Sequence, residues 1–74
     1  MTEKQKQYLQ FIHDFAVEYK RYPTRNEIAK GLNIPRRNVL AMVERLMLNQ
    51  YIIRAPYKRE VGKLTEKACY ALGI

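Results

Sequence analysis

Residues 22–39 constrain the fold of this chain more than any other segment. Thr24 and Glu27 stand three residues apart and predict a capping box, in which each side chain bonds the backbone N–H of the other residue. Asn33 is expected to end this helix with a positive φ, and Pro35 then opens the first turn of another helix. Two helices joined by so short a turn are typical of a helix-turn-helix, whose second helix enters the DNA major groove.

Periodic apolar residues predict a helix on each side of this segment. The first should cover about residues 3–21, because Thr2 and Gln5 form a second capping-box pattern before an apolar face. Gly31 is expected where this helix and the next approach closely. The third helix should cover about residues 36–49, with an inward stripe made of Val39, Val43, Leu46 and Met47.

After residue 50 the pattern becomes that of a β-hairpin. Residues 51–54 are β-branched and aromatic and predict a strand, residues 55–60 predict a loop, and residues 61–64 predict the return strand. Thr65 should cap a final helix over residues 66–72.

These elements predict one mainly α (α+β) domain covering residues 1–74. It has a three-helix core, a two-stranded β-hairpin and a short C-terminal helix. That is the arrangement of a winged helix-turn-helix, with a recognition helix at about 36–49 and a wing at about 52–64.

The charge favours a polyanionic partner. The chain has 14 Lys and Arg against 7 Asp and Glu, a formal net charge of +7. This positive charge could also serve only to keep the protein soluble, but the positions of the cations favour nucleic acid as the partner. One group surrounds the helix-turn-helix and another lies in the hairpin: Arg25, Lys30, Arg36, Arg37 and Arg45, then Arg54, Lys58, Arg59 and Lys63.

Catalytic chemistry is not expected. Cys69 and His13 are the only cysteine and histidine, too few for a metal site, and the carboxylates are scattered without an acid/base pair. We therefore expect no enzyme, cofactor, metal or small-molecule substrate. No apolar run is long enough for a membrane span and the first residues are polar, so no membrane partner and a cytoplasmic, nucleoid-associated location are expected.

Two groups of residues resemble known families. One group resembles the N-terminal DNA-binding domain of LexA repressors, with its Pro-Thr-x-x-Glu-Ile-Ala second helix: residues 2–5, Leu9, residues 11–12, residues 22–29, Leu32 and Asn38. A second group resembles the winged-helix repressor pattern, including a MarR-like Leu-Thr-x-Lys after the wing: residues 43–46, 51–52 and 63–67. The resemblance implies a winged helix that binds DNA.

The chain also departs from these families. Gln50 stands where winged helices usually carry glycine, between the third helix and the strand. No Ser/Lys dyad can be assigned, so the self-cleavage of LexA repressors is not carried over. The size is typical of a small regulator from a phage, plasmid or other mobile element.

The start of the third helix should read bases. Cations at a helix N-terminus oppose the macrodipole, so Arg36 and Arg37 need another reason to stand there. One could bind guanine and the other a phosphate. Asn38 could pair with adenine or bond a phosphate, and Leu40 could touch a thymine methyl group. The predicted base contacts are Arg36, Arg37, Asn38, Leu40 and Ala41.

The backbone contacts should come from the second helix, the third helix and the wing. Thr24 is expected to cap its helix and bond a phosphate, and Tyr57 to pack on a sugar or on its own hairpin. The predicted backbone or wing contacts are Thr24, Arg25, Arg45, Arg54, Tyr57, Lys58, Arg59 and Lys63.

The sequence thus predicts a sequence-specific double-stranded DNA-binding transcriptional regulator, with repression as the expected action. The alternative is a winged-helix module that binds a host or partner protein through Leu40, Leu48 and Tyr57. Leu48 could instead pack under the hairpin. A homodimer through Phe11, Tyr70 and Ile74 and a monomer both remain open.

Overall fold

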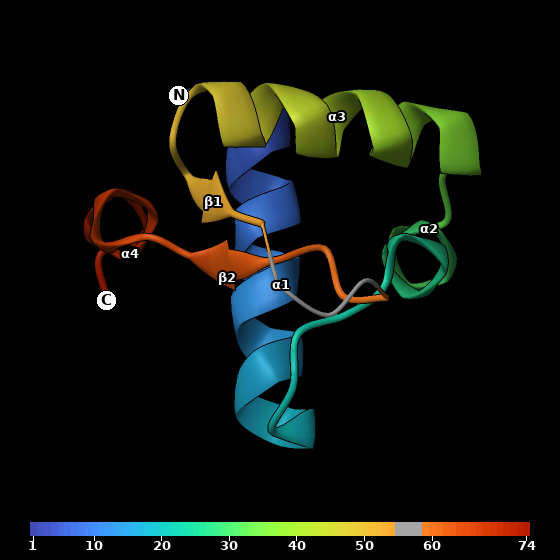
Figure 1. Cartoon of the computed structure of the whole chain (residues 1–74), viewed down its shortest axis with the longest axis horizontal. Helices are drawn as coiled ribbons and strands as arrows, with labels where there is room; N and C mark the ends of the chain where they lie inside the picture. The colour runs from blue at the N-terminus through green and yellow to red at the C-terminus, as the bar shows by residue number, and fades with distance from the viewer. Residues whose placement is uncertain (55–58) are drawn as a thin grey trace.

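The chain is mainly helical, with a small antiparallel sheet (Figure 1). The structure is a computed structural model that describes residues 1–54 and 59–74. In these residues the elements follow in the order α1 (Glu3–Tyr19), α2 (Arg25–Leu32), α3 (Arg36–Leu48), β1 (Ile52–Ile53), β2 (Lys63–Leu64) and α4 (Glu66–Leu72).

The predicted capping boxes begin α1 and α2. The Gln5 N–H donates to Thr2 Oγ1 at 3.1 Å, and the Thr2 N–H donates to Gln5 Oε1 at 3.0 Å. The Glu27 N–H donates to Thr24 Oγ1 at 3.2 Å, and the Thr24 N–H donates to Glu27 Oε1 at 2.8 Å. Side chains thus satisfy N–H groups that have no partner inside the helix.

The helix ends are set by residues with positive φ. Asn33 has φ 57°, as predicted. Lys20 has φ 60° and donates its N–H to Ala16 O at 3.0 Å, so α1 ends at Tyr19, earlier than the predicted Arg21. The third helix ends at Leu48 rather than Asn49, and Gln50 follows with φ 64°.

The helices surround the sheet on several sides. In Figure 1, α3 lies across the N-terminal part of α1, while α2 and α4 stand at opposite ends of the molecule with the sheet between them. The contacts agree with this view: α1 touches α2 and α4, α2 touches α3, and β1 touches α3. α3 thus packs on α2 and β1 on one side, while several of its residues are exposed at the surface.

Apolar residues from every helix meet in one core. Leu9, Ile28 and Leu46 are fully buried there, and the predicted inward stripe of α3 is confirmed except that Met47 is only half-buried. Gly31 lies against Phe11, and a Cβ atom at Gly31 would overlap the Phe11 ring. A side chain at Gly31 would therefore have to displace the Phe11 ring, and the glycine lies where α1 and α2 approach closely, as predicted.

The hairpin strands are shorter than predicted. Ile52 pairs with Leu64 and Ile53 with Lys63, whereas residues 51–54 and 61–64 were expected to be strands. Tyr51 is held by α3 instead, because its N–H donates to Leu46 O at 2.9 Å. The hairpin also carries a contact that the sequence did not predict: the Val61 N–H donates to Pro23 O at 2.9 Å, before α2.

Some apolar side chains lie elsewhere than expected. Leu48 is 81% exposed, so its predicted packing under the hairpin is wrong. Phe11 packs against the core beside Gly31 and is only partly available for the expected dimer contact. Tyr70 at 88% and Ile74 at 60% are exposed on the C-terminal segment.

Candidate nucleic-acid interface

The outward side of α3 is the first part of the candidate site. Val39, Val43 and Leu46 are buried and define the inward side of this helix. With about 100° of rotation per residue, the opposite side carries a ridge of four residues. All four are exposed: Arg37, Ala41, Glu44 and Leu48, here called the α3 ridge.

The predicted base-contact residues do not all share this ridge. Arg37 and Ala41 belong to it, and Leu40 lies beside it, 38% exposed. Arg36 turns toward α2 instead, where its Nε donates to Asn26 Oδ1 at 2.6 Å. Its guanidinium is therefore positioned beside the start of α2 rather than on the ridge.

An open polar hollow lies next to the ridge. It measures about 360 Å³ and takes side chains from α2, from α3 and from the segment before β2. The residues that line it are Thr24, Arg25, Asn26, Arg36 and Arg59, here called the arginine hollow. Thr24, Arg25, Arg36 and Arg59 were each predicted to contact DNA, and the structure brings them together.

Contacts made by Glu60 and Val61 explain why Arg59 reaches α2. The Tyr22 N–H donates to the Glu60 carboxylate at 3.0 Å, and Thr24 forms an isolated β-bridge with Glu60. Together with the bond from Val61 to Pro23, these contacts fix the returning chain against the segment between α1 and α2. Residues far apart in sequence thus form one basic surface.

The charge of the arginine hollow is not neutralised by its neighbours. Glu27 is the acidic residue in the first turn of α2, but its carboxylate binds Arg21 through contacts of 2.9 and 2.7 Å. The Arg21 hydrogen bond and the Thr24 N–H lower the pKa of Glu27 from 4.5 to about 2. Within the described residues, no carboxylate pairs with Arg25, Arg36 or Arg59.

A second basic edge lies on the other side of α3. Asn38, Ala41 and Arg45 line a hollow together with Lys4 from the first turn of α1. Lys4 was missed by the sequence analysis, because the contact between α1 and α3 depends on the tertiary fold. The ridge is therefore flanked by cations on both sides.

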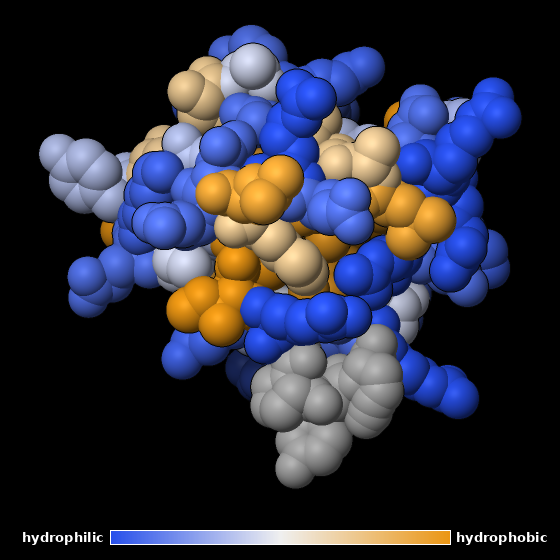
Figure 2. Space-filling view, turned by 45° about the horizontal axis from the view of Figure 1, so that its top comes forward, coloured by the Kyte–Doolittle hydropathy of each residue, from blue (hydrophilic) through white to orange (hydrophobic). Residues whose placement is uncertain are grey.

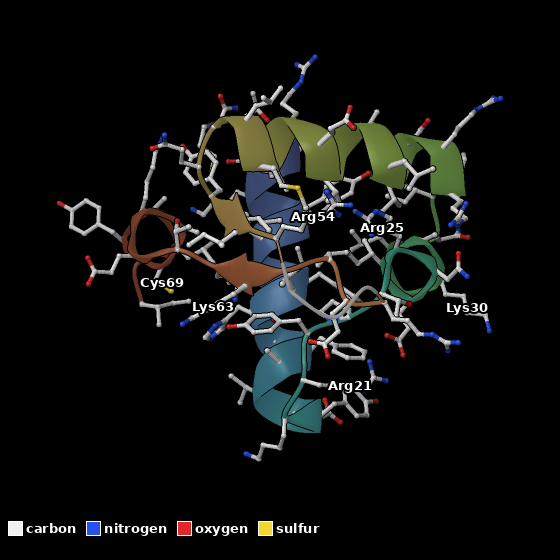
Figure 3. The ribbon with its side chains drawn as sticks, viewed as in Figure 1. Arg21, Arg25, Lys30, Arg54, Lys63 and Cys69 are labelled. Atoms are coloured by element: carbon white, nitrogen blue, oxygen red, sulfur yellow. The ribbon has the colours of Figure 1, made fainter. Side chains whose placement is uncertain are left out.

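The remaining predicted wing contacts are less concentrated. Arg54 and Lys63 are exposed, but neither lines the arginine hollow. In Figure 3, Lys63 lies toward α4 and Lys30 extends from the side of α2 that faces away from the sheet. The predicted contacts Tyr57 and Lys58 fall outside the described residues.

Three further observations concern metal binding, Cys69 and membrane spanning. In the part of the chain that the structure describes, no group of three or more His, Cys, Asp or Glu side chains could hold a metal ion. Cys69 is half-buried against the core, which agrees with a packing role. None of the helices described is long and apolar enough to cross a membrane.

The sequence matches no protein-family model, and no curated protein matches it.

Proposed function

We propose that this chain is a winged helix-turn-helix protein that binds double-stranded DNA sequence-specifically and regulates transcription. The order of three helices, a hairpin and a final helix supports this reading. The observation that carries it is the arginine hollow, where Arg25, Arg36 and Arg59 converge beside the exposed α3 ridge. A net charge of +7 agrees with a polyanionic partner.

In the proposed complex, each surface has its own task. The arginine hollow holds phosphates of one strand, because guanidinium groups bind phosphate oxygens through paired N–H donors. Lys4 and Arg45 hold phosphates on the other side of α3. The ridge then enters the major groove, where Arg37 can bind guanine through O6 and N7. Residues 52–64 act as the wing.

We propose repression as the regulatory action, by occupation of promoter DNA. The repressor-like sequence patterns favour it over activation. Binding as a dimer would join two such domains on neighbouring half-sites, and the exposed Tyr70 and Ile74 are the side chains available for that contact.

Paired arginine variants test this division of tasks. Arg37→Ala should weaken binding to a selected duplex by about 1–3 kcal/mol and weaken random-sequence binding much less, because a base contact is lost. Arg59→Ala should weaken both by similar factors, because a phosphate contact carries no sequence information. Fluorescence anisotropy with the two duplexes measures both effects.

Two results would contradict the assignment. An equal loss on both duplexes for Arg37→Ala would make this residue a phosphate contact. Unchanged binding for Arg59→Ala would remove the arginine hollow from the interface.

A protein-binding module is the second candidate, and exposed apolar residues favour it. Leu48 and Ile53 are 81% and 60% exposed. Figure 2 shows hydrophobic side chains among hydrophilic ones on the face where α3 comes forward. Exposed hydrophobic side chains that gather on one face are typical of protein interfaces. Failure to bind any duplex at low salt would favour this function over DNA binding.

A further inference from the structure

Glu44 is an anomaly on the surface proposed to face DNA. It is exposed at the centre of the α3 ridge, between Ala41 and Leu48. A carboxylate in this place repels the phosphate backbone and lowers the affinity for every DNA sequence. Its presence therefore needs a reason of its own.

The fold does not supply that reason. Side chains on a helix meet those three and four residues away, and around Glu44 these positions hold Leu40, Ala41, Met47 and Leu48. No cation stands among them. Arg45 is the next residue, and its side chain leaves the helix about 100° away. Among the described residues, no ion pair neutralises Glu44.

Most other carboxylates have a structural role. Glu27 accepts the Thr24 N–H at the start of α2, and Glu60, beside the hairpin, accepts the Tyr22 N–H. Asp14 accepts from Gln10 within α1 at 3.0 Å. Glu3 and Glu66 lie in the first turns of their helices, where the macrodipole favours negative charge. None of these three roles applies to Glu44 among the described residues.

Major-groove chemistry does supply a reason. An ionised carboxylate can only accept hydrogen bonds. Guanine presents acceptors at O6 and N7, thymine presents O4, and adenine sets its amino group beside the N7 acceptor. Cytosine presents its N4 amino group as a donor. A carboxylate on the ridge therefore favours cytosine over the other bases.

We infer that Glu44 is a specificity-determining residue that accepts a hydrogen bond from the N4 amino group of a cytosine in the target site. The inference rests on the proposed DNA-binding function. The same carboxylate discriminates against other sequences, because without a cytosine partner it is desolvated among the apolar side chains of the ridge without a hydrogen bond.

The test is a selection from a randomised duplex pool with three proteins: wild type, Glu44→Ala and Glu18→Ala. Glu18 is a matched control, because it is exposed and lies near the end of α1 that is far from α3 (Figure 1). Both variants remove one negative charge. The wild-type and Glu18→Ala motifs should share a cytosine that the Glu44→Ala motif lacks.

Anisotropy on the wild-type motif, with each of the four base pairs at that position, gives the magnitude. Glu44→Ala should lower the preference for cytosine by about tenfold, while its affinity for random duplex rises. If Glu44→Ala raises the affinity for selected and random duplexes by one factor and keeps the motif, Glu44 only repels phosphate and the inference is wrong. If the wild-type protein binds no duplex at low salt, both the proposed DNA-binding function and the inference about Glu44 are wrong.

Discussion

At the residue scale, the positive-φ positions show which local features a sequence can predict. Asn33 was predicted, because asparagine tolerates the left-handed region and stands between two helical patterns. Lys20 and Gln50 also have positive φ, but neither residue type favours it. The surrounding structure imposes the conformation there, so sequence reasoning placed the end of the first helix too late.

Gln50 gives a prediction about stability. Its φ of 64° costs a residue with a Cβ atom about 1 kcal/mol, and glycine removes that cost. Part of the gain is offset because glycine is more flexible in the unfolded chain. We expect Gln50→Gly to raise the free energy of unfolding by up to about 1 kcal/mol, measured by urea denaturation.

The matched control is Gln7→Gly at an exposed position within α1. It should lower the free energy of unfolding by about 1 kcal/mol, because glycine is a poor helix former. If both substitutions lower the free energy of unfolding equally, the positive φ of Gln50 does not cost the free energy that we assign to it.

At the element scale, helix starts were predictable and long-range contacts were not. Thr24 and Glu27 are close in sequence, so their capping box follows from local chemistry. The bonds from Tyr22 to Glu60 and from Val61 to Pro23 each join residues 38 positions apart, and no local pattern signals them. The ion pair between Arg21 and Glu27 likewise depends on the turn after α1.

Glu27 gives a prediction about pH dependence. Its folded pKa of about 2 lies below the ordinary 4.5, so its stabilising contribution is present above pH 4.5 and is lost as the pH falls toward 2. Glu27→Gln keeps a side chain that can cap the helix but loses the charge. Because the pair is partly exposed, we expect a loss of about 1 kcal/mol or less at pH 7.

Urea denaturation of both proteins from pH 7 to pH 2 checks this expectation. The difference between their free energies of unfolding should shrink below pH 4.5, in the range where Glu27 takes up a proton. A difference that stays constant down to pH 2 would contradict the assigned role of the Glu27 carboxylate.

At the scale of the whole molecule, the arginines of the arginine hollow were predicted as DNA contacts, but their grouping and the contribution of Lys4 were not. Arg25, Arg36 and Arg59 were selected for charge and position, and their convergence follows only from the fold. Lys63 was selected on the same grounds and lies outside the arginine hollow. Charge counts thus indicate the kind of partner, whereas the tertiary contacts decide which cations act together.

The salt dependence of duplex binding tests the central proposal most directly. Wild-type protein would be titrated against a selected duplex by anisotropy at several salt concentrations. If about six phosphates are contacted, the logarithm of the association constant should fall against the logarithm of salt concentration with a slope of roughly −5. A slope near zero, or no binding at low salt, would contradict DNA recognition by the arginine hollow and the α3 ridge.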